Sequence, residues 1–376
     1  MLSQKISVLH LYKDYYPPIV GGIEKNINLI CTSLKNEFDI KVLVSNRKCY
    51  YEKEVIDGIE IYKIGSLFRI ASAPISPTYP FWLKKFKADI LHFHHPNPTS
   101  ELSYLLAKPK GKVVVTYHSD IIRQKLGLKL YSGLLKRFLA NAKIILATSS
   151  NYIESSEFLS KFKHKCRVVP LGIDLEKFSI RPEEKELYEN EKRERNRIQV
   201  VFVGMLRYYK GLHFLIDAMR EVDAELKIIG KGPEEDSLRK QVGELGLNEK
   251  IKFLGEISDK ELVKELYLSD IFCLPSHLRS EAYGVCQIEA MTCGLPVVST
   301  NLNTGVPFVN KDGESGIIVE VGSSKALANA INFLIKNPEK RMEMGKKAQR
   351  RAKALFSSKT MVDEIKKVYY MIINQN

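Results

Sequence analysis

The sequence predicts two α/β domains in tandem, each with a doubly wound parallel β-sheet covered by helices. Short β-branched runs alternate with amphipathic segments along the chain of 376 residues, a pattern typical of parallel sheets. The length fits about two domains. A highly charged stretch divides the alternation. The expected parts are a first domain 1–180, a charged linker or surface segment 181–197, a second domain 198–356 and a C-terminal helix 357–376.

Five runs in the first half have the composition of buried strands. They are 5–11, 40–45, 88–94, 112–118 and 143–149. Residues 24–35 have the apolar spacing of a helix. Ligands of open α/β sheets bind beyond the carboxyl ends of the strands, so the loops that follow the strands are where a site is expected.

The second half repeats this organisation after a charged stretch. Eleven of the sixteen residues in 182–197 are charged and show no apolar face, which is typical of a solvated segment. The later strand runs are 198–204, 225–230, 250–255, 270–276, 295–300 and 315–321. The helix expected over residues 357–374 would dock on a domain through apolar residues near one face, which are Met361, Ile365, Val368 and Tyr369.

The composition is that of an ordinary soluble globular protein, with 44% hydrophobic and 27% charged residues. No apolar run reaches 18 residues, and the N-terminal residues do not resemble a secretory signal. The six cysteines are scattered, which favours reduced thiols in the cytoplasm over disulfides or a zinc site.

The net charge of +14 is uneven along the chain. Residues 1–180 hold 27 Lys and Arg against 15 Asp and Glu, whereas the remainder holds 31 against 29. A basic first half suits nucleic acid, an anionic membrane or a phosphorylated substrate, and a generally Lys-rich surface explains it equally well. A basic nucleic-acid-binding protein is therefore one alternative, although the sequence has no aromatic-and-basic recognition motif and no basic tail.

Three features of the first half follow predicted strands. Gly21 and Gly22 open a helix, where backbone N–H groups can approach an anion; a tight turn with positive φ is the alternative. His118 could donate to a phosphate or a sugar hydroxyl, but a lone histidine is more often structural. The segment 92–98 holds three histidines without a carboxylate or cysteine at ligand spacing, so no metal is expected there.

Two loops of the second half offer anion-binding groups. Arg207 and Lys210 follow Gly204 at a strand end, where two cations suit a diphosphate; two solvated surface cations are the alternative. The segment 228–236 repeats the order of strand, glycines and helix. It lacks the full G-x-G-x-x-G pattern, so a dinucleotide site is not supported.

Glu281 and Glu289 stand eight residues apart in the mostly apolar segment 280–294. Glu281 is expected in a loop and Glu289 in the helix that follows, with free backbone N–H groups between them. Such acids can accept from a ribose diol and a hexose hydroxyl. Ion pairs with Lys or Arg are the alternative.

Taken in order, these motifs resemble those of glycosyltransferase family 4, whose members are retaining enzymes with the GT-B fold. The stretch E-A-Y-G-V-C-Q-I-E resembles the family signature of two glutamates separated by seven residues. The likeness covers nearly the whole chain, and it is closest to bacterial and archaeal rhamnosyl and mannosyl transferases of polysaccharide assembly. The further motifs are YPPIVGGIE, TYHSD, VVPLGIDLEKF, GMLRYYKG, IIGKGP and NTGVPFVN; the closer likeness rests on 71–80, 94–102 and 117–125.

The resemblance implies two Rossmann-like domains facing across a cleft, with the C-terminal helix returning to the N-terminal domain. It implies transfer of a hexose, mannose or rhamnose favoured, from a nucleotide diphosphate sugar, GDP-mannose favoured, to a saccharide or lipid-linked saccharide acceptor. No cofactor and no metal is implied, and the sequence contains no Asp-x-Asp pair. A sugar-nucleotide isomerase of the same architecture, such as a 2-epimerase, is the alternative enzyme.

The resemblance also implies roles for individual residues. Glu289 would bind the donor ribose, Glu281 a hydroxyl of the transferred sugar, and Lys210 the diphosphate. The remaining donor-site residues would be Gly21, Gly22, Gly204, Arg207, Ala282, Tyr283, Gly284 and Val285. His118 would touch the donor sugar near the reacting centre, and the acceptor would meet Glu24, Asp120 and Arg123.

One position departs from the family pattern, and one segment suggests a membrane contact. Met205 stands where many relatives have Arg, and Arg207 is the candidate replacement. A basic first domain suits a lipid-diphosphate acceptor at an anionic inner leaflet, with residues 77–87 as the contact. A helix start with a buried Trp82 is the alternative. The protein is expected in the cytoplasm, where the membrane alternative would place it peripherally on the inner face of the cell membrane.

Overall fold

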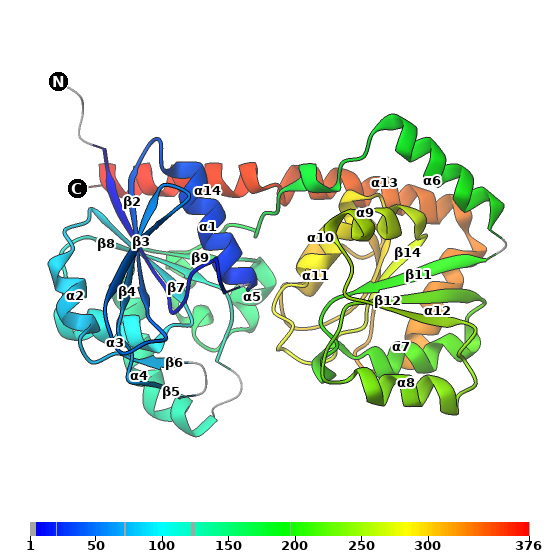
Figure 1. Cartoon of the computed structure of the whole chain (residues 1–376), viewed down its shortest axis with the longest axis horizontal. Coiled ribbons are helices and arrows are strands. Elements are labelled where there is room, and N and C mark those ends of the chain that lie inside the picture. Colours follow the sequence, from blue (N-terminus) through cyan, green and yellow to red (C-terminus); the bar gives the residue numbers. More distant parts are fainter. Residues whose placement is uncertain (1–4, 20, 71–72, 122–124, 196, 376) are drawn as a thin grey trace. The chain divides into compact units, whose positions relative to one another are not determined.

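The computed structural model describes residues 5–19, 21–70, 73–121, 125–195 and 197–375, except for the side chains of 125–130. These residues form two compact units (Figure 1). Unit 1 comprises residues 1–172 and 358–376, and unit 2 comprises residues 173–357. The first boundary therefore lies ahead of the charged segment, a few residues before the expected position at 180.

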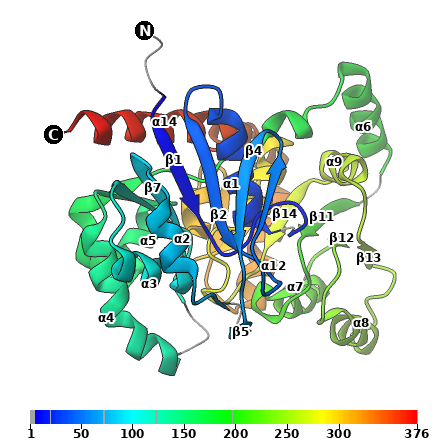
Figure 2. The same cartoon turned by 60° about the vertical axis from the view of Figure 1, so that its left-hand side comes forward.

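Unit 1 is built on an eight-stranded sheet in the order β10-β9-β8-β7-β1-β2-β4-β3. Neighbouring strands are parallel except for the hairpin of β3 and β4 (Figure 2 shows β7, β1, β2 and β4 side by side). The strands are β1 (Ser7–Leu11), β2 (Asp39–Ser45), β3 (Glu52–Ile56), β4 (Ile59–Ile64), β7 (Ile90–His95), β8 (Lys112–Tyr117), β9 (Ile144–Ala147) and β10 (Cys166–Val168), with a separate hairpin of β5 (Phe68–Ile70) and β6 (Ala73–Ile75). All five predicted strands are present.

The last helix of the chain completes the core of unit 1, as predicted. α14 (Ser358–Asn374) packs with α1 (Gly22–Leu34) over the sheet, and its Ile365 and Val368 are buried in the same core as Ile27 (Figure 1). Lys112 Nζ donates to the Ile372 carbonyl at 2.7 Å and so caps the end of α14. The other helices are α2 (Tyr79–Lys85), α3 (Pro98–Ala107), α4 (Lys125–Asn141), α5 (Ser150–Ser155) and η1 (Leu159–Lys165).

Unit 2 contains a six-stranded parallel sheet in the order β13-β12-β11-β14-β15-β16. Its strands confirm all six predicted runs: β11 (Ile198–Val203), β12 (Ala224–Ile229), β13 (Ile251–Gly255), β14 (Ile271–Leu274), β15 (Val297–Thr300) and β16 (Gly316–Val319). From β11 the successive strands β12 and β13 are added on one side of the sheet, and from β14 the strands β15 and β16 are added on the other side. The loops that leave these two neighbouring strands therefore diverge at a switch point, where open α/β sheets bind ligands.

The charged segment 181–197 is mostly a helix of unit 2 and not a linker between domains. α6 (Pro182–Glu194) has no buried side chain, and a capping box formed by Arg181 and Glu184 starts it. Lys192 and Arg195 both pair with Asp270, at 3.4 and 2.9 Å. The alternative of an exposed surface segment is therefore the correct one.

The remaining helices of unit 2 surround its sheet. They are η2 (Leu175–Phe178), η3 (Tyr208–Lys210), α7 (Leu212–Ala218), η4 (Met219–Glu221), α8 (Glu235–Glu244), α9 (Asp259–Leu268), α10 (Val285–Thr292), α11 (Val306–Val309), α12 (Ser324–Lys336) and α13 (Pro338–Leu355). Among the described residues of both units, no helix combines the length and apolarity needed to cross a membrane. All six cysteines are free thiols.

Candidate functional site

The two loops at the switch point of unit 2 are packed tightly against each other. The loop after β11 ends in η3 and Gly211, whose φ of 69° suits glycine. A Cβ atom on Gly211 would lie 2.2 Å from the carbonyl oxygen of Pro275 in the loop after β14. The backbone N–H of His277 also donates to the Tyr209 carbonyl at 3.0 Å. These contacts fix the positions of side chains on both loops.

Lys210 and Glu281 meet across these loops as a buried ion pair. Lys210 Nζ lies 2.5 Å from Glu281 Oε2, and the two residues are only 8% and 7% exposed. Ser276 Oγ donates to the same oxygen at 3.3 Å. Burial is the largest single influence and lowers the pKa of Lys210. The charge of Glu281, smaller contributions from Cys286 and Tyr209, and the hydrogen bond that the ammonium donates to Glu281 together outweigh burial, so the pKa lies above its ordinary value. The ion-pair alternative is thus correct for Glu281, and its partner is itself a predicted site residue.

Gly204 and two later glycines bring the neighbouring loops close to this pair. A Cβ on Gly204, whose φ is 149°, would lie 3.5 Å from Lys210 Nζ. A Cβ on Gly230 would lie 2.2 Å from the Gly204 carbonyl oxygen, and one on Gly232 would lie 2.3 Å from that of Leu206. The glycines after β11 and β12 therefore let two backbones approach each other beside the ammonium.

The segment between the two predicted acids starts α10, as expected. Gly284 is the N-cap residue with a φ of 71°, and a Cβ there would lie 2.6 Å from Leu274 Cδ2. The side chain of Tyr283 is buried, and the Ala282 carbonyl accepts from Gly305 N–H at 2.8 Å. The N–H groups of Val285 and Cys286, the first two of α10, have no partner within the helix itself and can donate to a ligand, whereas that of Gln287 donates to the Gly284 carbonyl at 2.9 Å.

Glu289 lies one turn further along α10 and is half-buried. The two acids therefore belong to different settings: Glu281 is in the loop and ion-paired, whereas Glu289 is on the helix. The structure brings Lys210, Gly204 and residues 281–285 together in unit 2.

Arg207 does not join this buried group. Its side chain is exposed, and its Nε donates to Met205 Sδ at 2.9 Å. Arg207 thus folds over the residue that replaces the usual family arginine. Two contacts of this region were not predicted from the sequence. The Ser276 hydroxyl contacts Glu281 within the same loop, and the approach of Gly305 to Ala282 joins segments that are distant in the chain.

Gly21 and Gly22 start α1, as predicted, but neither has a positive φ. The alternative of a turn with positive φ is therefore wrong. A Cβ on Gly21 would lie 2.1 Å from Glu24 Oε2, whereas one on Gly22 would meet nothing within 4 Å among the described residues. Glu24 is buried, and burial raises its pKa. The absence of a side chain at Gly21 thus makes room for the Glu24 carboxylate.

The residues after β8 divide between a buried histidine and a structural acid. His118 is buried, and its Nε2 lies 3.1 Å from His94 Nδ1. Asp120 Oδ1 accepts from Tyr117 at 2.8 Å and from Ser156 at 2.7 Å, which ties this loop to α5. Arg123, the third predicted acceptor residue, lies outside the described residues.

The histidines of β7 have neighbours that their spacing did not predict. Nitrogen atoms of His10, His92 and His94 lie within 4.8 Å of one another, close enough to be considered for a metal. The sequence spacing indicated no carboxylate ligand for the histidine segment, but in the fold Glu101 Oε1 lies 2.8 Å from His95 Nδ1. Glu101 comes from the first turn of α3, the helix that follows β7.

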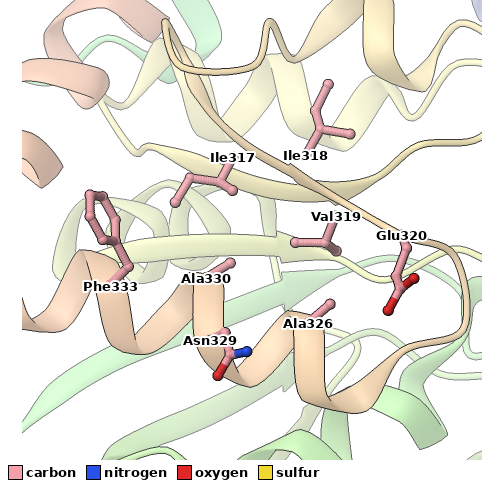
Figure 3. Close-up of a pocket in the computed structure, with 8 residues that line it drawn as sticks. All are labelled: Ile317, Ile318, Val319, Glu320, Ala326, Asn329, Ala330 and Phe333. Atoms are coloured by element: carbon pink, nitrogen blue, oxygen red, sulfur yellow. The ribbon is translucent and has the colours of Figure 1, made fainter.

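An open, mostly apolar groove lies elsewhere on unit 2 (Figure 3). It runs between the edge strand β16 and α12. The lining residues are Ile317, Ile318, Val319, Glu320, Ala326, Asn329, Ala330 and Phe333. The predicted site residues are not among them, so the groove is separate from the ion pair at the switch point.

Comparisons with known proteins match both halves of the chain. A family model described as Glycosyltransferase Family 4 matches residues 20–177, and one described as Glycosyl transferases group 1 matches residues 183–351. The D-rhamnosyltransferase WbpZ of Pseudomonas aeruginosa is 35% identical, over 93% of this chain and 92% of its own. The O-antigen chain mannosyltransferase C of Escherichia coli is 34% identical, over 97% of this chain and 98% of its own.

A solved structure shows the same fold. Anabaena Alr3699/HepE in complex with UDP superposes with a TM-score of 0.77 at 21% identity, covering 97% of this chain and all of that one. The fold is therefore GT-B, and the glycosyltransferase interpretation is favoured over an isomerase or a nucleic-acid-binding protein. With relatives above 30% identity along almost its entire length and the two-glutamate signature at the switch point of unit 2, this chain belongs to glycosyltransferase family 4.

Proposed function

We propose that this glycosyltransferase transfers a hexose from a nucleotide diphosphate sugar to a saccharide or lipid-linked saccharide, in the synthesis of a surface polysaccharide or glycoconjugate. Mannose or rhamnose is the favoured sugar and GDP-mannose the favoured donor, in line with the names of the rhamnosyl and mannosyl relatives. The observation that carries the proposal is the buried pair of Lys210 and Glu281 at a switch point, beside the start of α10.

The pair has the hydrogen-bonding capacity that a sugar diphosphate requires. An ammonium has three donors, and one of those of Lys210 serves Glu281, which leaves two for diphosphate oxygens. Glu281 Oε2 accepts from Lys210 and Ser276, so we assign Oε1 to a hydroxyl of the transferred sugar. We assign the ribose to Glu289 and further phosphate contacts to the backbone at Ala282–Val285.

In the proposed reaction the anomeric configuration is retained. The bond from the anomeric carbon to the diphosphate oxygen breaks, and the bond to the acceptor oxygen forms on the same face. The acceptor proton passes to the departing phosphate oxygen. Negative charge grows on the diphosphate, so Lys210 and the N-terminus of α10 act most strongly in the transition state. In this proposal they do so without a metal ion, because the sequence lacks an Asp-x-Asp pair.

A donor screen tests this function. Thermal stabilisation by GDP, UDP and dTDP identifies the nucleotide, and nucleotide release with a crude lipid acceptor identifies the sugar. We expect the strongest stabilisation by GDP and acceptor-dependent release from GDP-mannose. Conversion of the nucleotide sugar without any acceptor would instead favour an isomerase, and no response to any nucleotide would contradict the proposal.

We further propose a cytoplasmic enzyme whose unit 1 contacts an anionic membrane through α2. Phe81 is 60% exposed and Lys84 and Lys85 are exposed beside it, with Lys85 Nζ 4.2 Å from the Phe81 ring centroid. Trp82 is half-buried and stacks on Tyr51, with ring centroids 4.4 Å apart. The alternative of a helix start is correct, since α2 begins at Tyr79, but its buried residues are Tyr79 and Leu83 and not Trp82. Exposed aromatic and basic side chains together suit an anionic lipid surface.

Not every lysine of the basic first half is available for this contact. Lys112 caps α14, which removes it from the basic face. Sedimentation with vesicles that contain anionic lipid tests α2 directly. Binding should fall with salt and with Lys84→Glu plus Lys85→Glu, and Lys260→Glu on α9 of unit 2 is the control. Binding that is absent, or insensitive to salt, would contradict the membrane contact.

A further inference from the structure

Four buried histidines of unit 1 belong to one hydrogen-bonded chain that begins at β8 and passes through the C-terminal helix. Thr116 Oγ1 lies 2.7 Å from His92 Nε2, and His92 Nδ1 lies 2.6 Å from the hydroxyl of Tyr369 on α14. The same hydroxyl lies 3.3 Å from His10 Nε2 on β1. Tyr369 therefore bridges histidines from two neighbouring strands.

The hydrogen-bonded chain of side chains continues from His10 on β1 to His118 at the end of β8. His10 Nδ1 lies 3.0 Å from His94 Nε2, and His94 Nδ1 lies 3.1 Å from His118 Nε2. The rings of His94 and His118 are stacked, as are those of His10 and His94. The last nitrogen, His118 Nδ1, is buried and has no hydrogen-bond partner within the part of the chain that the structure describes.

All four rings are neutral at physiological pH. Burial lowers the pKa of His10 to about 3, and burial followed by the charge of His95 lowers that of His118 to about 3. Burial, reinforced by neighbouring histidines, holds the pKa of His92 and His94 well below the usual range. A neutral imidazole has one N–H and one bare nitrogen, so each ring donates on one side and accepts on the other. The direction chosen at one ring therefore determines the next.

The Tyr369 hydroxyl sets that direction, because it has one proton for two nitrogens. Hydrogen bonds donated by a hydroxyl are shorter, at about 2.7 Å, than those donated by N–H, at about 2.9–3.0 Å. The 2.6 Å contact to His92 is therefore the one that Tyr369 donates, and the 3.3 Å contact is donated by His10 Nε2. His92 then carries its proton on Nε2 and donates to Thr116 Oγ1 at 2.7 Å. The opposite direction would require the hydroxyl to donate at 3.3 Å and an N–H to donate at 2.6 Å, which fits these lengths worse.

The remaining protons follow from this assignment. With its proton on Nε2, His10 accepts at Nδ1 from His94 Nε2. His94 then accepts at Nδ1 from His118 Nε2. His118 consequently carries its proton on Nε2, and its Nδ1 is a bare acceptor.

We propose that Tyr369, acting through His10 and His94, holds His118 in the Nε2–H tautomer, so that Nδ1 accepts a hydrogen bond from a hydroxyl of the sugar substrate. A bare nitrogen cannot donate to an ionised phosphate oxygen, so the ligand group at His118 is a hydroxyl and not a phosphate. This reverses the direction expected from the sequence, in which His118 donates. Tyr369, His10 and His94 are positioning residues. The identity of the ligand rests on the proposed function, whereas the tautomer does not.

The hydrogen bonds also account for the histidines that resemble metal ligands. Each of the six ring nitrogens of His10, His92 and His94 already has a hydrogen-bond partner. A metal ion bound by one nitrogen of each ring would break a hydrogen bond at every one of them. It would also place a positive charge in a core where the rings are held neutral.

Nitrogen-15 NMR of the ligand-free protein with labelled histidines tests the tautomer directly. Protonated and bare imidazole nitrogens have widely separated chemical shifts, and the spectrum of His118→Gln assigns the resonances of His118. We expect a protonated Nε2 and a bare Nδ1. A His118 ring protonated at Nδ1 would overturn the proposal, and this measurement needs no variant to remain active.

Tyr369→Phe tests control from α14. The phenyl ring keeps the packing against Phe38, whose ring centroid lies 5.4 Å from that of Tyr369, and loses only the hydroxyl. His118 should then populate both tautomers. Tyr370→Phe, on the adjacent and 40% exposed residue, is the matched control and should leave the spectrum of His118 unchanged. An unchanged His118 tautomer in Tyr369→Phe would show that the Tyr369 hydroxyl does not set the direction of these hydrogen bonds, and would overturn the proposal.

Donor sugars with one hydroxyl replaced by fluorine test the ligand. Fluorine cannot donate, so one analogue should lose about tenfold in kcat/KM with the wild-type enzyme and much less with His118→Ala. An analogue series in which no loss depends on His118 would overturn the hydroxyl assignment. A failure of all nucleotide sugars to react would instead contradict the proposed function, while the NMR result would still decide the tautomer.

Discussion

Lys210 and Glu281 form an ion pair in the interior of unit 2, with Nζ 2.5 Å from Oε2 and both residues almost completely buried. Such a pair contributes little net stability while it is intact, because burial removes the hydration of both ions. Losing one partner is different, since the other is left as an unpaired buried charge.

Lys210→Met should therefore lower the free energy of unfolding by about 3–5 kcal/mol, whereas Lys210→Met combined with Glu281→Leu should recover most of it. Neither protein should transfer sugar. Urea denaturation gives the stabilities, and nucleotide release gives the activity. A single variant as stable as the wild type would contradict a buried pair, and an active double variant would contradict its role at the donor.

The two acids of the family signature should fail in different ways. Glu281→Ala should lose transfer while largely keeping nucleotide affinity. Glu289→Ala should weaken nucleotide binding itself, by roughly tenfold to a hundredfold for one hydrogen bond to a charged group. Calorimetric titration with the nucleotide measures this, with Glu244→Ala at the exposed end of α8 as the control. Normal binding and turnover in both site variants would show that the assigned ligand roles are wrong.

Gly305 should be required for the shape of the loop that precedes α10. A Cβ there would lie 2.4 Å from Tyr283 Cδ2 and 2.9 Å from the Ala282 carbonyl oxygen, so Gly305→Ala should displace residues 282–283 and reduce both stability and transfer. Gly243→Ala is the matched control. Gly243 lies inside α8 with open space around it among the described residues, and alanine should stabilise that helix by about 0.5–1 kcal/mol. Equal effects of the two substitutions on transfer would contradict the packing argument.

The buried histidines should make the fold sensitive to acid. The pKa of His10 and His118 is about 3 in the folded state against 6.5 for the ordinary group, so between these values the unfolded chain binds more protons. Stability is therefore fully present above about pH 6.5 and falls as the pH is lowered toward 3. The loss should be about 2 kcal/mol for each of these histidines by pH 5.

Urea denaturation at pH 7.5, 6 and 5 measures this dependence. His10→Gln should reduce the slope of stability against pH, whereas His164→Gln, on an exposed residue, should leave it unchanged. A stability that stays constant from pH 7.5 to pH 5 would show that these rings are not held neutral.

Most of the sheet framework could be predicted because strands buried on both faces are continuous apolar runs. The hairpin of β3 and β4 was missed, since its strands are short and half-exposed. α6 was read as a solvated segment because its stability comes from capping and from ion pairs of its own Lys192 and of the following Arg195 with Asp270, neither of which leaves an apolar stripe.

Candidate site residues could be predicted where they stand in one short motif, but the long-range contacts between them could not. Glu281 and Lys210 could be identified as site residues, but their mutual pairing joins loops that are 71 residues apart. His118 could be singled out by its place after a strand. Its link to Tyr369 depends on α14 returning to unit 1, and sequence spacing contains no signal for that hydrogen-bonded chain.

The return of α14 has a consequence for how the protein matures. Residues 358–374 leave the ribosome after all of unit 2. Unit 2 can therefore fold before α14 is available to complete the core of unit 1. The Tyr369 hydroxyl, to which we assign control of the His118 tautomer, arrives with this late segment. If the proposed hydrogen-bonded chain sets the tautomer of His118, that tautomer is established only after residue 369 has been synthesised and α14 has docked on unit 1.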